Sequence, residues 1–240
     1  MSRAPVVLVT ADVRAPTGNT PGPRVRPKRP EVFVGQAYLR AIEAAGGLPI
    51  VLPPGPVEPL SQVIDAADAV VLTGGNVDVH PHLYGEEPEG RLDRIEPERT
   101  ARELSLAQYC LSEGVPVLGI CGGMQVLAVA AGGRLIQDIL TENPNALEHE
   151  QPTDPATPWH DVQLSKPASQ WLGEHLSVNS THHQAVRDPG SLVACGWSSD
   201  GIIEAIADPA HPFALGLQWH PELLKQYAAY RGLIEAASRR

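Results

Sequence analysis

Cys121 stands where an apolar run gives way to glycines, a setting in which a cysteine can act as a nucleophile. The run 115–120 ends at this cysteine, Gly122 and Gly123 follow, and 124–131 is typical of a helix. A strand, a sharp turn and a helix in this order present the turn side chain at the carboxyl end of the strand. The helix N-terminus would favour the thiolate, which is the nucleophilic form. The alternatives are a small core residue and a glycine-rich turn that binds phosphate.

A histidine and a carboxylate lie two residues apart near the end of the chain. His220 and Glu222 flank Pro221, directly after the apolar run 213–218. In an extended chain, residues two apart project to the same side, so the carboxylate would fix one tautomer of the imidazole and leave its other nitrogen for a thiol. Cys121, His220 and Glu222 would then form a catalytic triad with cysteine as nucleophile. The alternative is a histidine that caps a helix, with a glutamate in its first turn.

Two glycines follow another apolar run. Gly74 and Gly75 come after 69–73, where they can expose backbone N–H groups at the carboxyl end of a strand. The N–H of Gly75 and that of Gly122, the residue after the nucleophile, would form an oxyanion hole. The alternative is an ordinary turn that ends a strand.

The elements that must position these residues alternate between strand and helix patterns. Short apolar runs at 5–10, 48–52, 69–73 and 115–120 predict strands, and the stretches at 32–45, 57–66 and 96–114 predict helices. This alternation, with nearly continuous apolar strands, predicts a parallel sheet covered on both faces. Later stretches predict loops at 14–30 and 143–158, short strands at 160–164, 175–178, 191–195, 202–206 and 213–218, and a last helix at 221–237.

Composition excludes several classes of protein. The 240 residues carry a formal net charge of −10, which argues against a nucleic-acid-binding surface of the usual basic kind. No apolar run reaches the roughly 18 residues that span a bilayer, and the N-terminus has no signal-type apolar region. The three cysteines, Cys110, Cys121 and Cys195, form no paired framework, so we expect a cytoplasmic protein. The length suits a single domain over 1–240.

Neighbouring histidines raise the question of a metal. His182 is followed by His183, and His80 lies two residues before His82. No Cys-x-x-Cys or His-x-x-x-His spacing accompanies them, so the local pattern predicts neither a metal site nor a cofactor.

Several motifs together resemble those of known enzymes. Gly-Ile-Cys-x-Gly-Met-Gln, Gln-Trp-His-Pro-Glu and the Gly-Gly loop, in the order in which they occur here, resemble class I glutamine amidotransferases. The stretches at 38–53, 83–88, 132–139 and 178–186 are similar to one branch, the γ-glutamyl-γ-aminobutyrate hydrolase family, also called peptidase family C26. The resemblance covers nearly the whole chain. It implies the flavodoxin-like α/β fold of these amidotransferases, with a mostly parallel central sheet and helices on both faces.

The resemblance also implies an activity. It predicts cleavage of γ-glutamyl amines to glutamate and amine through a γ-glutamyl thioester, as in polyamine catabolism, by the triad Cys121, His220 and Glu222. In the family the Gly-Gly loop helps to form the oxyanion hole and the His-His-Gln motif borders the active site. We therefore expect substrate contacts from Gly74, Gln125, His182 and His183. The family resemblance suggests a homodimer.

One position departs from the family pattern. Members of this branch usually carry arginine directly after the nucleophile, whereas this chain has Gly122, a difference that bears on the choice of substrate. Two further functions stay open: a glutaminase subunit that supplies ammonia to a separate synthetase, and a non-catalytic binding protein on the same fold.

Overall fold

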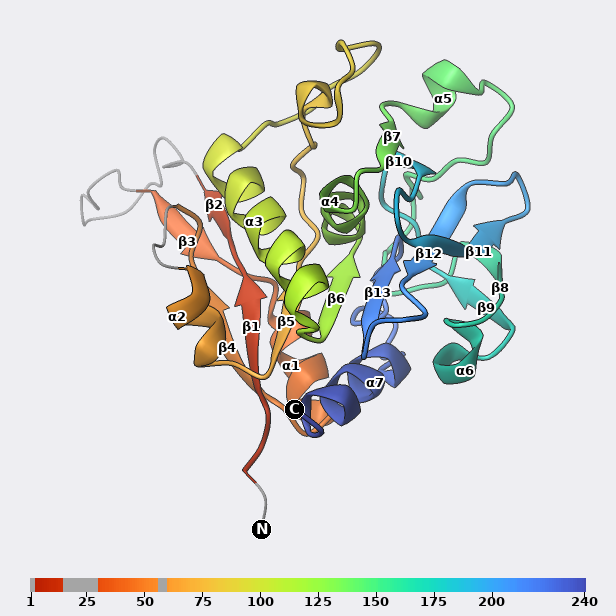
Figure 1. Ribbon diagram of the computed structural model, residues 1–240. Coiled ribbons are helices and arrows are strands. Elements are labelled where there is room, and N and C mark those ends of the chain that lie inside the picture. The colour runs from red at the N-terminus through yellow and green to blue at the C-terminus, as the bar shows by residue number, and fades with distance from the viewer. Residues whose placement is uncertain (1–2, 15–29, 56–59) are drawn as a thin grey trace, which may run out of the picture.

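A sheet of eleven strands runs through the protein, and its centre is parallel (Figure 1). The computed structural model describes residues 3–14, 30–55 and 60–240. The parallel strands lie side by side in the order β4 (Leu48–Leu52), β1 (Val6–Thr10), β5 (Ala69–Leu72), β6 (Val117–Ile120) and β13 (Ala214–Leu217). Strands β5, β6 and β13 are buried along their whole length, as their continuous apolar sequences predict.

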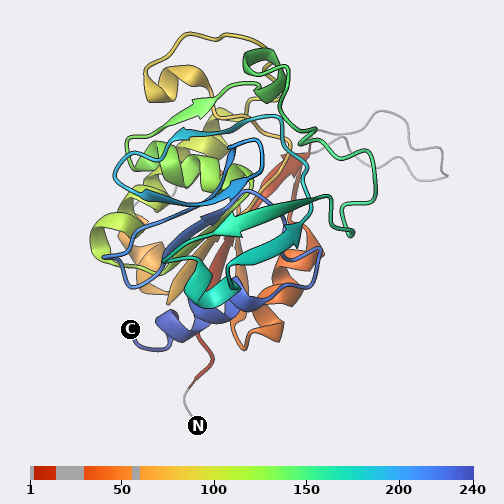
Figure 2. The ribbon, with the colours of Figure 1, turned by 90° about the vertical axis from the view of Figure 1, so that its right-hand side faces the viewer.

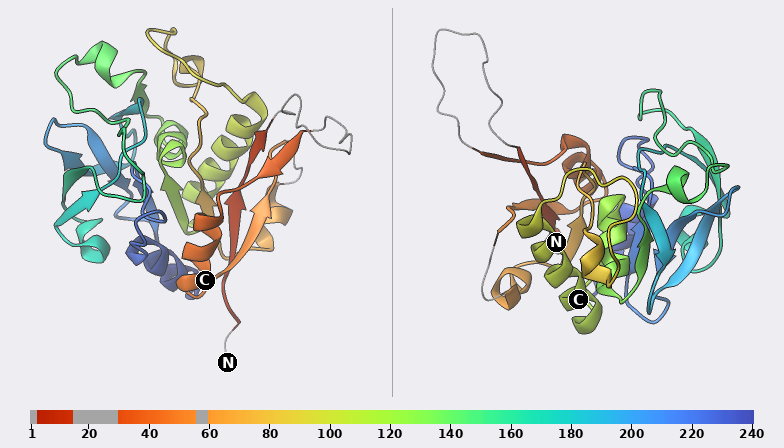
Figure 3. Two further views of the ribbon diagram at one scale, coloured as in Figure 1. Left: turned by 180° about the vertical axis from the view of Figure 1, so that it is seen from behind. Right: turned by 90° about the horizontal axis from the view of Figure 1, so that it is seen from above.

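Helices cover both faces of this parallel region. Helices α1 (Gln36–Ala44) and α7 (Ala228–Ala237) pack on one face, which the view from behind presents (Figure 3). On the other face lie α2 (Leu60–Asp65), α3 (Pro97–Glu113) and α4 (Gly122–Ala130). Successive side chains of β1 point to opposite faces of the sheet. Val7 packs in the core with α1 and α7, and Leu8 packs in the core with α2, α3 and α4. The expected α/β fold with helices on both faces is confirmed.

The second half of the chain extends the sheet with antiparallel strands (Figure 2). Beyond β13 come β12 (Ile203–Ala207), β11 (Val193–Ser198), β8 (His160–Leu164) and β9 (His175–Val178). Strands β10 (Ala185–Asp188) and β7 (Arg134–Ile136) branch from β12. The shorter elements are η1 (Pro81–Tyr84), α5 (Ile139–Glu142) and α6 (Ser169–Leu172). The predicted strands in this half are therefore confirmed to within a few residues, whereas β10 was not predicted.

Two helix starts differ from the prediction. The helix expected from Val32 begins at Gln36, because β3 (Glu31–Phe33) pairs with β2 (Asp12–Arg14) in a two-stranded sheet. The helix expected from Pro221 begins at Ala228, and the chain between them forms turns in which Lys225 has a φ of 57°. At Val32 the pairing with a distant segment outweighs the local helical pattern. Most of the predicted loop at 14–30, and the start of the helix at 57–66, lie outside the described residues.

Two further expectations concern the membrane and the cysteines. Within the described ranges no helix is long and apolar enough to cross a membrane. Cys110, Cys121 and Cys195 are all free thiols. Cys110 and Cys195 are fully buried in the core.

Candidate active site

Cys121 occupies the sharp turn that the sequence predicts between β6 and α4. Its backbone has φ 52° and ψ −112°, a conformation that residues other than glycine rarely adopt. Gly119 and Gly123 flank it at a very close approach of backbones: a Cβ on Gly123 would lie 2.1 Å from the carbonyl oxygen of Leu72. The glycines thus let α4 start directly against the sheet and hold the Cys121 side chain at the carboxyl end of β6.

Strand β13 brings the histidine and glutamate to the same edge of the sheet. It lies beside β6 in parallel, and the Cys121 N–H donates a hydrogen bond of 2.8 Å to the carbonyl of Leu217, the last residue of β13. The carboxyl ends of parallel strands meet at one edge of the sheet. His220, three residues after the end of β13, therefore lies at the same edge as the turn that holds Cys121. This topology joins two segments that are far apart in the sequence.

His220 and Glu222 form a close, buried pair. The imidazole Nδ1 donates to Glu222 Oε1 at 2.7 Å, and the side chains are 12% and 1% exposed. The ring also lies next to Cys121: a Cβ built on Gly74 would lie 2.9 Å from Cε1 of His220 and 3.0 Å from Cβ of Cys121. Burial alone would lower the pKa of His220, but the nearby charges of Glu222 and Cys121 outweigh it and hold this pKa well above its ordinary value. The arrangement favours an imidazolium beside the sulfur.

Two residues that the motifs did not single out position His220. The fully buried amide of Asn179 accepts the His220 N–H at 2.8 Å and donates to the His220 carbonyl at 3.2 Å. The Tyr38 hydroxyl lies 3.3 Å from Nδ1 of His220 and accepts the N–H of Gly74 at 3.0 Å. Both residues fall within stretches that carried the family resemblance, which was the available signal for them.

A buried arginine fixes the glycine loop after β5. Arg99 of α3 donates to the carbonyls of Thr73 and Gly74 at 3.0 Å each. Glu103 accepts from Arg99 at 3.0 Å and from the hydroxyl of Thr10 at 2.6 Å. The side chains of Arg99 and Glu103 are 5% and 4% exposed. Because Arg99 holds these carbonyls on its own side, the loop at Gly74 and Gly75 keeps a fixed orientation. No local sequence pattern predicted the hydrogen bonds among Arg99, Glu103 and this loop.

The two N–H groups expected to form an oxyanion hole border one pocket. Gly75 and Gly122 both line it together with Cys121. Among the described residues, neither N–H donates a hydrogen bond. A Cβ on Gly75 would lie 2.6 Å from Nη1 of Arg99, so this position needs glycine, whereas a Cβ on Gly122 would find its nearest atoms 3.9 Å away. Gly122, which stands where the family usually has arginine, therefore has space for a side chain.

Charged groups of both signs line the rest of the pocket. Arg91 donates to Asp93 and to Glu150 at 2.6 Å each. His183 contacts Asp78 at 3.1 Å through Nε2. Burial lowers the pKa of His183, but the hydrogen bond and charge of Asp78, together with the hydrogen bond to Asp138, outweigh burial and raise it. Such a lining suits a small, polar ligand that carries both an ammonium and a carboxylate.

Of the four residues expected to contact substrate, three line the pocket and one does not. Gln125, His182 and His183 line the pocket, but Gly74 does not: it packs against the catalytic candidates, and a Cβ there would lie 2.9 Å from Cε1 of His220. His182 turns both nitrogens away from Cys121, since Nδ1 contacts the carbonyl of Gln184 at 2.9 Å and Nε2 faces Glu204.

The remaining cysteines lack these surroundings. Burial raises the pKa of Cys110 to about 12 and that of Cys195 to about 11. Neither lines the pocket, and both would stay as thiols at neutral pH. Cys121 is thus the cysteine placed for chemistry.

A sheet whose parallel region holds a cysteine in a strand-to-helix turn, beside a histidine–glutamate pair, defines a class I glutamine amidotransferase-like protein. Two solved structures share the fold: a glutamine amidotransferase of Thermotoga maritima (18% identity, TM-score 0.58, 99% of this chain and 92% of that one) and a glutamine amidotransferase of Methylobacillus flagellatus (20%, 0.56, 94% and 73%). Within this class the chain belongs to the peptidase C26 family, whose model matches residues 5–222.

Relatives within this family have names that point to hydrolases and amidotransferases. The γ-glutamyl-γ-aminobutyrate hydrolase of Escherichia coli K12 is 40% identical over 214 residues, which is 83% of each chain. The "Putative glutamine amidotransferase-like protein YvdE" of Lactococcus lactis is 37% identical over 193 residues, or 79% of this chain and 80% of its own.

Proposed function

We propose that the protein is a cysteine-dependent hydrolase that cleaves γ-glutamyl amides to glutamate and an amine. The observation that carries this proposal is that Cys121, next to the paired side chains of His220 and Glu222, lines one pocket together with Gly75 and Gly122. The name of the Escherichia coli relative supports the substrate class, and polyamine catabolism would supply such substrates. Three free cysteines support a reducing compartment such as the cytoplasm.

The first half of the reaction would form a thioester. The Cys121 thiolate attacks the side-chain amide carbon of the γ-glutamyl group, so a C–S bond forms and the carbonyl electrons move to its oxygen. The N–H groups of Gly75 and Gly122 stabilise this oxyanion, an interaction whose loss typically costs about 10²–10³ in rate. His220 then gives its proton to the leaving nitrogen, the C–N bond breaks, and the amine departs.

The second half would hydrolyse the thioester. His220, now neutral, takes a proton from water, the hydroxide attacks the thioester carbon, and the C–S bond breaks to release glutamate and regenerate the thiolate–imidazolium pair. Glu222 keeps the ring in one tautomer and stabilises its charged form throughout. Glu222 thus acts on the imidazole rather than on the substrate.

The pocket lining supports recognition of the glutamyl half. Its α-ammonium would face the carboxylates of Asp78 and Glu150, and its α-carboxylate would face Arg91 or the positively charged form of His183. Cation and anion subsites close together select a free amino acid head group over neutral amides. The amine half would then leave toward the side of Gly122.

The test uses the purified chain alone. A panel of γ-glutamyl amines and glutamine is offered, and released glutamate is measured; we expect turnover without a partner and none with Cys121→Ala. A glutamine-like alkylating agent should label Cys121 by mass spectrometry and leave Cys110 and Cys195 unlabelled. Inactivity on every γ-glutamyl amide, with glutaminase activity once a synthetase is added, would instead establish the subunit function. No turnover under either condition would favour a binding protein.

A further inference from the structure

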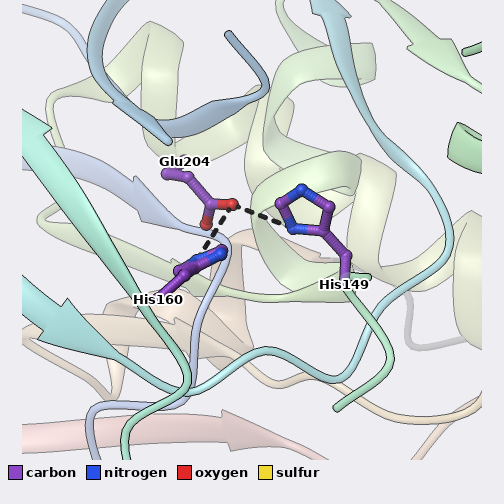
Figure 4. A group of neighbouring side chains, drawn as sticks. All are labelled: His149, His160 and Glu204. Atoms are coloured by element: carbon purple, nitrogen blue, oxygen red, sulfur yellow. Dashed lines mark ion pairs between the residues drawn. The ribbon is translucent and has the colours of Figure 1, made fainter. Parts of the chain in front are cut away.

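His149 and His160 lie beside Glu204, with the possible ligand atoms of these three residues within 4.8 Å of one another (Figure 4). A third histidine, His182, has its Nε2 3.8 Å from the same carboxylate. His149 comes from the loop after α5, His160 begins β8, His182 precedes His183, and Glu204 lies in β12. All four side chains are at most 6% exposed. The chemistry proposed above uses none of these four as an acid, a base or a nucleophile.

The spacing of their polar atoms fits an ion better than hydrogen bonds. Glu204 Oε1 lies 3.4 Å from His149 Nδ1, 3.5 Å from His160 Nε2 and 3.8 Å from His182 Nε2. Hydrogen bonds between nitrogen and oxygen are usually about 2.7–3.2 Å long. Ligands placed about 2.0–2.2 Å from a tetrahedral zinc ion are roughly 3.3–3.6 Å apart, which is close to the distances found here.

Within the described part of the chain, the cluster is left without enough partners. Both oxygens of Glu204 and the Nε2 atoms of His160 and His182 are buried and make no hydrogen bond there. A buried carboxylate with unpaired oxygens is strongly unfavourable unless a cation neutralises it. The protein has thus buried a carboxyl group and several imidazole nitrogens around one point.

The other contacts of His149 and His182 leave one ring nitrogen of each histidine facing Glu204. Nε2 of His149 lies 3.1 Å from the Asp200 carboxylate, and its Nδ1 lies 3.4 Å from Glu204 Oε1 and 3.3 Å from the Ser180 hydroxyl. Nδ1 of His182 lies 2.9 Å from the carbonyl of Gln184, which leaves Nε2 facing the same oxygen. Histidines that bind metals nearly always use their second nitrogen in this way, because it fixes the tautomer that offers the lone pair.

We propose that His149, His160, His182 and Glu204 bind one zinc ion. Three imidazole nitrogens and one carboxylate oxygen suit tetrahedral Zn²⁺, and four protein ligands make a closed, structural site. His149 and His182 also line a second cavity, through which an ion could enter. The ligands come from four separate segments, which is why local spacing predicted no metal. The zinc would tie the loop of His149 and the residue before His183 to the sheet.

The proposal does not depend on the hydrolase function, and its test measures metal. The full chain is purified without a histidine tag from zinc-supplemented cells, and zinc is counted by elemental analysis. We expect about one zinc per chain. After chelation, adding zinc back should raise the melting temperature by about 5 °C, because the ion binds the folded state alone. Cobalt added to the stripped protein should give the visible absorption bands of tetrahedral Co²⁺.

Variants identify the ligands. Glu204→Gln and His160→Gln should each lower the zinc content to about a tenth. The matched control replaces His80 and His82 by glutamine; their rings also lie close together, 4.7 Å between centroids, but on the surface, and this variant should keep one zinc. If the variant proteins fail to fold, the cobalt spectrum of the unaltered chain still tests whether the site binds a metal ion. Zinc-free protein with no thermal response to zinc and no cobalt bands would overturn the site.

Discussion

The histidine that faces Cys121 depends on its carboxylate for its charge. Burial alone would lower the pKa of His220, and the charge of Glu222, 2.7 Å away, contributes most to raising it. A raised pKa means that the imidazolium persists through neutral pH and is lost as pH rises through that value. Glu222 therefore sets the alkaline limit of the charged His220.

We predict that Glu222→Gln shifts the alkaline limb of the kcat/KM profile to lower pH. The amide keeps the shape but removes the charge, so burial then dominates and the pKa of His220 falls. At neutral pH kcat/KM should drop by about 10²–10⁴-fold, and His220→Ala should lose more. Rates measured across a pH series check this. An unchanged alkaline limb would show that Glu222 does not control His220.

Gly122 is the residue at which this chain parts from its family's usual arginine. Because a Cβ there meets its nearest atoms at 3.9 Å, Gly122→Arg should fold. The added cation beside the nucleophile should favour leaving groups that carry a carboxylate. We predict that the ratio of kcat/KM for γ-glutamyl-γ-aminobutyrate over an uncharged γ-glutamyl amine rises about tenfold, which corresponds to roughly 1.4 kcal/mol. A ratio that stays constant would remove Gly122 from substrate selection.

At the scale of the element, the elbow depends on two helices that meet the sheet at their N-termini. The first turn of α4 packs closely on the carbonyl of Leu72. Arg99, in the first turn of α3, donates hydrogen bonds to the carbonyls of Thr73 and Gly74. The strand β5 and its glycine loop are therefore fixed from both helices. Positioning of the oxyanion N–H groups is a property of this packing rather than of the loop sequence alone.

Neighbouring glycines at the start of α4 give a matched test of that packing. A Cβ on Gly123 would lie 2.1 Å from the Leu72 carbonyl oxygen, whereas a Cβ on Gly122 is unobstructed. We predict that Gly123→Ala lowers the free energy of unfolding by about 1–3 kcal/mol or more, and that Gly122→Ala changes it by less than about 0.5 kcal/mol. Denaturant unfolding of both variants measures the difference. Equal stabilities would mean that the helix can shift away from the sheet.

At the scale of the whole molecule, the parallel region and the elbow were predictable because their signals are local. The apolar runs that became β1, β5 and β6 are bounded by glycine and proline, and a strand buried on both faces must be apolar throughout. The site residues at the ends of β6 and β13 followed from motifs of a few residues each. Their meeting at one sheet edge follows from parallel pairing.

What the sequence did not reveal depends on contacts between distant segments. Arg99 is typical of an exposed helical residue, yet it is 5% exposed and bonded to a loop 25 residues earlier. Val32 fits a helix until β2 pairs with its segment. The cluster around Glu204 draws on four segments, none of which shows metal spacing by itself. Long-range pairing leaves no periodic trace in a single sequence, so these features needed the fold.

The place of β13 in the sheet also has a consequence for synthesis of the protein. This strand leaves the ribosome well after the Cys121 segment, yet it lies between β6 and β12, in the interior of the sheet. At about 5–20 residues per second, the Cys121 segment would wait roughly 5–20 s for His220 to emerge. Until then the nascent chain carries the Cys121 thiol without the imidazole beside it, and the gap next to β6 in the sheet stays unfilled.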